Sequence, residues 1–392
     1  MSKTNWMELD REHIAPTYAR FPVVASSGKG AILTDENGKE YIDFGSGIGV
    51  TSFGYCDPLW VEAVQSQAAQ LQHTSNLYYT KPCIELAALL CKKTGMSKVF
   101  FSNSGAEANE CAIKVARQYA EKKHGKEYST ILTLKESFHG RTLTTLAATG
   151  QVHYHEQFQP LTPGFAFGDS EDIEKVRQMA EAEKAAGILL ECVQGEGGVN
   201  VMSRDFVRGV ADICKEKDIL LMIDEVQTGN GRTGKLYSYM HYDIEPDVVS
   251  TAKGLGGGMP IGATLMSDKC ADVFSPGDHG STFGGNPVVC AGALSILSRM
   301  DDDFLAQVGK KGQMIRDHLT GKPGVKEITG LGMMVGIVTE RAAGDIVKDC
   351  LKAGVLCLTA KDKLRLLPPL NIPEEDLIRG LDIVAEACAK QE

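Results

Sequence analysis

The sequence predicts an α/β protein in which a large domain, built on a mainly parallel sheet flanked by helices, is joined by a smaller α+β domain. Short apolar runs alternate with helical segments between about residues 85 and 270, an alternation typical of parallel strands joined by right-handed crossovers. The pattern is β-like in the first 55 residues and mixed after about 300. We therefore expect a large ligand-binding domain at 56–295 and a small domain that combines 1–55 with 296–392.

The first element expected is a β-hairpin, because strand-like residues 31–34 and 40–44 flank Asn37-Gly38, a dipeptide that supplies two positive φ angles to a tight turn. Buried strands follow, each predicted from a short apolar run, at 98–101, 130–134, 187–190, 219–223 and 247–252. Helices are expected at 108–123, 171–185 and 205–217, with a later β-like run at 335–338 and a closing helix at about 375–390.

Composition and charge limit the classes of protein and partner. With 392 residues, 43% apolar and 23% charged, the chain is an ordinary globular protein rather than a disordered or fibrous one. A net charge of −10 argues against nucleic acid or an anionic membrane as the main partner. The 11 Cys residues include no C-x-x-C pair, and no signal core or membrane span is found, so we expect a reducing cytoplasm and no metal site.

The loops after the predicted strands are where ligands are expected, because an open parallel sheet binds them beyond its carboxyl ends. After the strand at 98–101, Ser104 and Glu107 form a capping box, so a helix begins at Gly105. The free N–H groups at such a helix start suit a phosphate. A capped helix that binds nothing is an equally good interpretation of this motif alone.

Two further loops carry polar side chains. Phe138, His139 and Arg141 bring together an aromatic face, an imidazole and a guanidinium. Taken alone, Phe138 in the core and Arg141 on the surface would be the simpler interpretation. Glu191 and Glu196 lie among glycines and, in isolation, are typical of a solvated turn.

Asp224 and Lys253 each follow a buried strand. A carboxylate after four apolar residues is costly to bury unpaired, so Asp224 is expected to face a positive group, with a helix cap as the alternative. Lys253 is placed to be desolvated, which lowers the pKa of the amine and makes it nucleophilic, although an ordinary surface Lys is the alternative. The run 229–235 has P-loop spacing but is followed by Leu236, where Mg²⁺ coordination needs Ser or Thr.

In combination these loops supply what a protein provides to pyridoxal phosphate: a phosphate site, a stacking ring, an acid for the pyridinium proton and an amine that forms a Schiff base. The motifs are DFGSGIGV at 43–50, NSGAEAN at 103–109, FHGRT at 138–142, QGEGG at 194–198, DEVQ at 224–227, AKG at 252–254 and HGSTFGGNP at 279–287. From about residue 17 to the C-terminus the chain resembles the class III, fold-type I aminotransferases. Within that family it is most similar to the N-acetylornithine aminotransferase branch and its succinylornithine relatives.

The resemblance implies a role for each cofactor-binding residue. Lys253 is similar to the lysine that binds the cofactor covalently and moves the proton, and Asp224 to the carboxylate that keeps the pyridine nitrogen protonated. The other contacts implied are Ser104, Gly105 and Ala106 at the phosphate, Phe138 and Val226 on the two ring faces, Gln227 at the phenolic oxygen, and Thr282, which reaches the phosphate from a neighbouring subunit.

The resemblance also implies substrates and an assembly. Arg141 and Arg365 resemble two carboxylate-binding arginines, Glu196 resembles the glutamate that pairs with Arg365, and Ser281 is expected at the substrate. The implied reaction transfers the terminal amino group of N-acetylornithine to 2-oxoglutarate, giving N-acetylglutamate semialdehyde and glutamate, as in arginine biosynthesis. Because Thr282 arrives from a neighbour, a homodimer with active sites at its interface is expected.

Other functions stay open at this point. A succinylornithine or other ω-amino acid aminotransferase, acting in arginine breakdown or lysine synthesis, would carry the same motifs. A semialdehyde aminomutase of the same fold would transfer no amine to an external oxo acid, and a nucleotide-binding protein would use 229–235. The chain departs from the usual family pattern at Cys192, where Pro is common, and at Tyr55, which we expect to alter the pocket wall.

Overall fold

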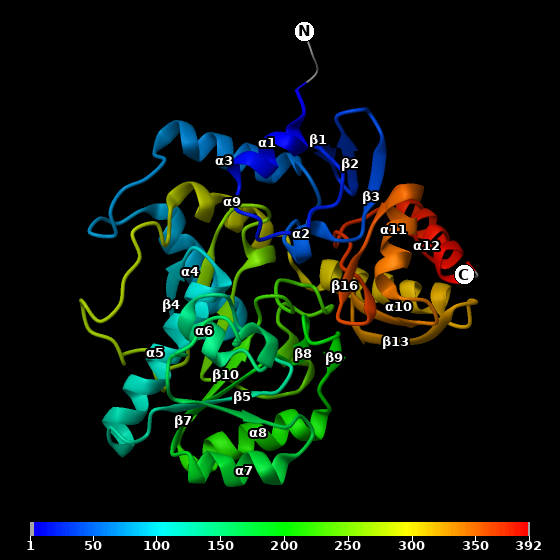
Figure 1. Ribbon diagram of the computed structural model, residues 1–392. Coiled ribbons are helices and arrows are strands. Elements are labelled where there is room, and N and C mark those ends of the chain that lie inside the picture. Colours follow the sequence, from blue (N-terminus) through cyan, green and yellow to red (C-terminus); the bar gives the residue numbers. More distant parts are fainter. Residues whose placement is uncertain (1–3, 391–392) are drawn as a thin grey trace.

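The structure, a computed structural model, describes residues 4–390 and is organised around a central sheet of seven strands (Figure 1). Across the sheet the strands are β4 (Lys98–Ser102), β12 (Gly262–Met266), β11 (Val248–Thr251), β10 (Leu220–Asp224), β7 (Ala185–Leu190), β5 (Thr130–Leu134) and β6 (Phe165–Gly168). The predicted strands are all present, whereas β6 and β12 were not predicted.

The sheet is mainly parallel, as predicted. All neighbours from β11 to β6 are parallel, and only β12 runs against both of its neighbours, β11 and β4. Because β4 and β11 are both antiparallel to β12, they point the same way as the rest of the sheet. Gly262 at the start of β12 pairs with Ser102 at the end of β4. The carboxyl ends of the parallel strands therefore share one edge with β4.

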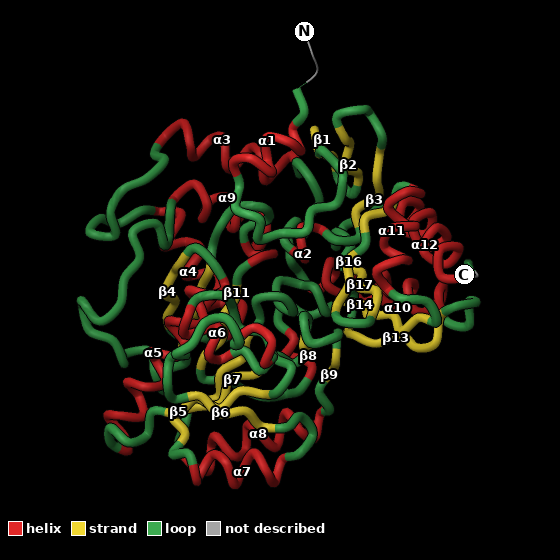
Figure 2. Tube along the Cα trace, viewed as in Figure 1, coloured by secondary structure: helices red, strands yellow, loops and turns green. Residues whose placement is uncertain are grey.

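Helices cover both faces of this sheet. Helix α5 (Gly105–His124) packs on the face that carries Leu220 and Met222 of β10. Helices α7 (Ile173–Ala182) and α8 (Arg204–Lys217) lie together on the other face, where Leu221 and Ile223 point (Figures 1 and 2). The helix predicted at 171–185 is too long, because the chain turns at Lys184, with φ 48°, and enters β7 at residue 185.

The predicted hairpin is confirmed, but its turn differs from the prediction. Strands β2 (Ile32–Asp35) and β3 (Glu40–Asp43) pair antiparallel. Of the Asn37-Gly38 dipeptide only Gly38 has a positive φ, 84°. The turn is organised by the side chain of Asp35, whose Oδ1 accepts hydrogen bonds from the N–H groups of Asn37 at 2.8 Å and Lys39 at 3.0 Å. A side chain that mimics a turn acceptor thus replaces the second positive φ.

Both chain ends meet in the remaining sheets. Residue Val355 of β15 (Val355–Leu356) pairs with Ile42 of β3, so the C-terminal part closes the N-terminal sheet beside it (Figure 1). Helix α9 (Pro287–Leu297) runs across the predicted boundary at 295, and the domain limits stay predictions. The other elements here are β1 (Ala25–Lys29), β13 (Val325–Leu331), β14 (Met334–Thr339), β16 (Leu358–Ala360), β17 (Lys363–Leu366), α10 (Asp302–Leu319), α11 (Ala343–Ala353) and α12 (Glu374–Ala389).

The remaining α-helices and strands are α1 (Trp6–His13), α2 (Ser46–Gly49), α3 (Pro58–Gln70), α4 (Lys81–Thr94), α6 (Leu143–Ala148), β8 (Val193–Gln194) and β9 (Asn200–Val201). Within residues 4–390, none of the helices combines the length and the apolar character needed to cross a membrane. All 11 cysteines are free thiols.

Candidate active site

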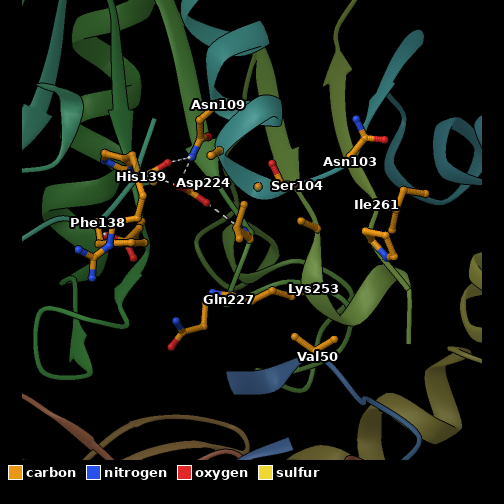
Figure 3. Close-up of a pocket in the computed structure, with 18 of the residues that line it drawn as sticks. Val50, Asn103, Ser104, Asn109, Phe138, His139, Asp224, Gln227, Lys253 and Ile261 are labelled. Carbon is orange, nitrogen blue, oxygen red and sulfur yellow. Dashed lines mark hydrogen bonds and ion pairs between the residues drawn. The ribbon is translucent and has the colours of Figure 1, made fainter. Parts of the chain in front are cut away.

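A cavity of about 630 Å³ lies at the carboxyl edge of the central sheet, where the loops after β4, β5, β10 and β11 converge (Figure 3). The structure brings most of the predicted residues together there. Those that line the cavity are Ser104, Gly105, Ala106, Phe138, Arg141, Asp224, Val226, Gln227 and Lys253. The expectation that ligands gather at this edge is therefore met by one continuous hollow.

The start of α5 forms one wall of the cavity. Ser104 caps the helix by accepting a hydrogen bond from the N–H of Glu107 at 3.2 Å. The predicted capping box is only half right, because the Glu107 carboxylate returns to the N–H of Asn103 at 2.5 Å rather than to that of Ser104. Gly105 is required here, since a Cβ on it would lie 2.5 Å from Val226 Cγ1. The first N–H groups of a helix have no intrahelical acceptor, so the start of α5 on this wall suits an anion.

Asp224, at the end of β10, is buried at 3% exposure and held by a network of donors (Figure 3). Its Oδ2 accepts hydrogen bonds from Asn109 Nδ2 at 2.7 Å and His139 Nδ1 at 2.8 Å, and its Oδ1 accepts one from Val226 N–H at 3.0 Å. Ser250 Oγ in turn donates to Asn109 Oδ1 at 2.5 Å. The carboxylate is thus fixed in place on the cavity wall, as expected for a group that meets a cationic partner.

Glu191 joins the loops that follow β5 and β7. Its carboxylate accepts hydrogen bonds from the N–H groups of Phe138 at 2.9 Å and Gly195 at 3.3 Å. Burial raises the pKa of Glu191 to about 7, against the lowering effect of the nearby His139. Glu191 is 6% exposed, so the solvated turn that the isolated sequence suggested is wrong at this residue. It instead positions the ring of Phe138 by holding its backbone.

Lys253 follows β11 and points into the cavity in Figure 3. Burial lowers the pKa of its amine, although the negative charges of Glu196 and Asp224 act in the opposite direction. Its backbone has φ 43°, in the left-handed region that a residue with a side chain rarely adopts. The amine is therefore desolvated, as predicted, and the chain that carries it is strained.

Arg365, on β17, forms a closed group with Glu196 and Gln227. Its Nη1 lies 2.6 Å from Glu196 Oε1 and 3.0 Å from Gln227 Oε1, and Gln227 Nε2 donates to Glu196 Oε1 at 3.0 Å. Burial alone would raise the pKa of Glu196, but the charge and hydrogen bond of Arg365, the hydrogen bond from Gln227 and the charge of Lys253 together lower it. The sequence-based pairing of Glu196 with Arg365 is present, and the Gln227 side chain belongs to the same group.

Arg141 lies in a different environment. Its side chain is exposed, and its guanidinium carbon stands 4.1 Å from the centre of the Tyr154 ring and 5.6 Å from that of Phe138. Stacking on two aromatic faces orients the guanidinium without consuming its hydrogen-bond donors. Arg141 is therefore free to bind a carboxylate at the cavity.

Ser281 and Thr282 do not line this cavity. They line a separate hollow of about 380 Å³ with His73, Ser75 and Asn76. Ser281 Oγ accepts a hydrogen bond from Asn103 Nδ2 at 3.1 Å, whereas Thr282 is exposed. The structure of the single chain thus separates these two residues from Lys253.

The two departures from the family pattern also lie outside the cavity. Cys192 is fully buried in the hydrophobic core. The Tyr55 hydroxyl donates to Asp43 Oδ2 at 2.6 Å, and its ring lines another hollow of about 240 Å³ with Phe21 and Ile48. The expectation that Tyr55 alters the main pocket wall is not met, because Tyr55 does not line the main cavity and its hydroxyl is bonded to Asp43.

The sequence reasoning assigned no role to several lining residues, among them Asn109, His139, Tyr18 and Val50. Asn109 could have been noticed in the sequence, because it is a polar residue on the apolar, buried face of α5 that also carries Ala108 and Ala112. His139 is 2% exposed, and no partner for its Nε2 is found in the described part of the chain. A buried polar atom without a partner in the chain is completed by a ligand or by an ordered water.

These observations fit pyridoxal phosphate. The N–H groups at Gly105 and Ala106 suit the phosphate, the Phe138 ring and the Val226 side chain suit its pyridine faces, and the fixed Asp224 carboxylate suits a protonated ring nitrogen. The Lys253 amine lies in the same cavity, and a side chain at Gly105 would occupy the space that Val226 uses.

Comparisons with known proteins agree with this geometry. Residues 13–388 match the family Aminotransferase class-III. The chain is 48% identical to acetylornithine aminotransferase of Haemophilus ducreyi over 100% of both chains, and 46% identical to that of Methanocaldococcus jannaschii over 98% of both. The ornithine aminotransferase structure from Toxoplasma gondii, which has PLP at partial occupancy in its active site, matches with a TM-score of 0.93 at 32% identity, covering 99% of this chain and 95% of that one.

A solved acetylornithine aminotransferase from Elizabethkingia anophelis matches with a TM-score of 0.88 at 34% identity, covering 97% of each chain. The match in sequence and the match in structure both extend over nearly the whole chain. The fold is thus that of the fold-type I aminotransferases, whose members use pyridoxal phosphate. The chain belongs to the class-III aminotransferases.

Proposed function

We propose that this aminotransferase moves the terminal amino group of N-acetylornithine to 2-oxoglutarate, giving N-acetylglutamate semialdehyde and glutamate. The observation that carries the proposal is the pairing of the buried Arg365 with Glu196, while Arg141 stays free at the same cavity. This arrangement suits a first substrate whose carboxylate is far from the reacting amine. The names of the relatives from H. ducreyi and M. jannaschii support the same substrate.

Pyridoxal phosphate, when bound, supplies a carbonyl that condenses with amines and a ring that accepts electron density from the substrate carbon. The Lys253 amine, whose pKa is lowered by burial, holds the cofactor and then moves the proton from the amine-bearing carbon of the substrate. The Asp224 carboxylate, fixed by Asn109 and His139, stabilises positive charge on the ring nitrogen. The N–H groups at the start of α5 hold the phosphate.

The two arginines serve different half-reactions. Arg141 binds the α-carboxylate of the acylated ornithine through its planar fork of donors. Glu196 keeps Arg365 neutralised during this step, so that the buried guanidinium does not draw the same carboxylate toward the reacting centre. When 2-oxoglutarate enters, its carboxylate beside the keto carbon replaces Glu196 on Arg365. Ser281 is proposed to contact substrate only from an assembled interface.

A homodimer is part of the proposal. Thr282 is exposed, and its neighbour Phe283 exposes 60% of its surface. The segment that faces this loop across the 380 Å³ hollow continues into Leu77 and Tyr79, which are 86% and 96% exposed. Large apolar side chains grouped on one surface are typical of an interface between subunits. In the dimer Thr282 would approach the phosphate site of the partner.

The test uses the purified full-length protein with pyridoxal phosphate, N-acetylornithine and 2-oxoglutarate. Formation of glutamate and a semialdehyde in equal amounts supports the proposal, whereas turnover without glutamate would indicate an aminomutase. N-succinylornithine and free ornithine serve as competing donors, and kcat/KM for each identifies the preferred acyl group. A preference for free ornithine would overturn the assignment of N-acetylornithine.

A further inference from the structure

The P-loop-like run 229–235 contributes no lining residue to the cavity, yet it is bonded to the segment that carries Lys253. Asn230 is 2% exposed and its Nδ2 donates to Thr251 Oγ1 at 2.9 Å and to the carbonyl of Ala252 at 3.0 Å. Both hydrogens of the amide are used. The carbonyl of Ala252 belongs to the peptide unit directly before Lys253.

The backbone is also held on the other side of Lys253, at the carbonyl of Gly254. Ser52, also 2% exposed, donates from Oγ to the carbonyl of Gly254 at 3.3 Å. A Cβ on Gly254 would lie 2.5 Å from Ser52 Oγ and 3.2 Å from Asn230 Cβ, so these two side chains enclose the residue after the lysine. Lys253 thus lies between two backbone carbonyls, those of Ala252 and Gly254, each of which accepts a hydrogen bond from a buried side chain outside the segment.

The backbone of Lys253, at φ 43°, is held by these two side chains together with a local turn, in which the N–H groups of Leu255 and Gly256 donate to the carbonyls of Ala252 and Lys253. A left-handed conformation in a residue with a side chain is unfavourable and persists only where the surroundings fix it. Without the two side chains the segment would relax toward negative φ and the long side chain of Lys253 would leave its direction into the cavity. The Asn230 Oδ1 is buried, and no partner for it is found within residues 4–390, so the only hydrogen bonds that this side chain makes there are the two at the lysine segment.

We propose that Asn230, assisted by Ser52, is a positioning residue that holds the strained backbone of Lys253 and so aims its amine at the reacting atoms. The inference rests on the proposed role of Lys253 in aminotransfer. It accounts for a loop that has the spacing of a phosphate-binding motif but whose Asn side chain binds backbone instead.

The variant Asn230→Gly removes the side-chain donor while tolerating the local φ of 55°, so it adds no strain of its own. Asp218→Gly is the matched control, because it makes the same kind of change at a residue with φ 49° that does not line the cavity. Both are compared with wild type for secondary structure and melting temperature before any other measurement.

The primary readout is the pH profile of Lys253 acylation by acetic anhydride, measured by mass spectrometry on the full chain without bound pyridoxal phosphate or substrate. We expect the midpoint for Lys253 in Asn230→Gly to rise by roughly half a pH unit or more, since relaxation exposes an amine whose pKa is lowered by burial. In the holoenzyme we expect kcat to fall on the order of 10²-fold, as misplacement of a reacting group implies. KM should change less than about threefold.

An unchanged acylation midpoint and kcat in a folded Asn230→Gly protein would overturn the proposal, as would equal changes in Asp218→Gly. If Asn230→Gly does not fold, Ser52→Ala becomes the deciding variant. We expect its acylation midpoint to shift in the same direction but less, because the Ser52 hydrogen bond is longer. An unchanged midpoint in Ser52→Ala would then overturn the proposal. The acylation profile needs no turnover. A shifted midpoint in a protein that transfers no amine would therefore refute the proposed function and leave the positioning role standing.

Discussion

Asp224 and Arg365 are two buried charged groups that both influence the Lys253 amine. They are stabilised in different ways, one by hydrogen-bond donors and the other by an opposite charge. Both are 3% exposed. Asp224 accepts hydrogen bonds from Asn109, His139 and a backbone N–H, and no Lys or Arg in the described part of the chain pairs with it. Arg365 instead has a full countercharge in Glu196 at 2.6 Å. In the proposed function the first site meets the positive ring nitrogen of the cofactor, whereas the second stays neutralised until a carboxylate of 2-oxoglutarate replaces Glu196.

The largest effect is expected at the amine that both charges influence. Lys253→Ala should lower kcat by more than about a thousandfold, because the group that holds the cofactor and the group that moves the proton are lost together. Borohydride should then no longer fix the cofactor to the chain, although the α5 site and Asp224 still bind it. A rate above about a thousandth of that of wild type would show that Lys253 is not the group that moves the proton, and that the two charges do not act on the reaction through it.

Asp224→Asn tests whether the first site needs a charge or only a shape. The amide has the same size but does not stabilise a positive ring nitrogen, so we expect kcat to fall by about 10²–10³-fold in a folded protein. The absorbance spectrum and the melting temperature, measured together, separate loss of chemistry from loss of structure. Normal turnover would make Asp224 a structural partner of Asn109 and His139.

Arg365→Ala and Arg141→Ala separate the neutralised arginine from the free one. We expect Arg365→Ala to slow mainly the 2-oxoglutarate half-reaction and Arg141→Ala mainly the acylornithine half-reaction, each by about 10–100-fold. Stopped-flow absorbance of single half-reactions measures both. If both variants slowed both half-reactions equally, the two arginines would not serve different half-reactions.

Glu196→Gln should give the smallest change, and a gain. Removing the countercharge frees Arg365, so activity toward α-amino donors such as glutamate should rise several-fold. Arg365 lowers the pKa of Glu196. In wild type the Glu196 carboxylate therefore keeps its negative charge at any pH above about 4–5, the usual pKa range of a Glu, and is protonated only at lower pH. The donor preference of wild type should therefore not change between about pH 6 and 9; a titration within that window would contradict the pairing.

The sequence predicts the central sheet well because each buried strand is a short apolar run with a chemical residue at its end. It missed β12, whose Gly-Ala start lies in a glycine-rich stretch and whose direction is set only by pairing with Phe101 and Thr251. The hairpin turn was mispredicted because the acceptor is the side chain of Asp35, two residues before the Asn-Gly pair.

Lys253 and Asp224 could be predicted as site residues from the sequence alone, because a Lys or Asp directly after a buried apolar run is unusual in any context. Asn109, His139 and Asn230 have no such signal. Asn109 and His139 act on Asp224, far along the chain, and Asn230 acts on the end of the strand β11, which pairs with β10. Their partners therefore become apparent only in the folded structure.

The parallel pairing of Ile42 with Val355 also has a consequence during synthesis. A ribosome adds about 5–20 residues per second, so β3 waits on the order of 15–60 s for a strand made about 300 residues later. The central sheet ends at Met266 and has all its strands well before that. Meanwhile Ile42 and Phe44, buried in the finished protein, stay uncovered on the nascent chain. Ribosome-bound chains that stop before Val355 should therefore be cut by protease in the hairpin while the central sheet resists.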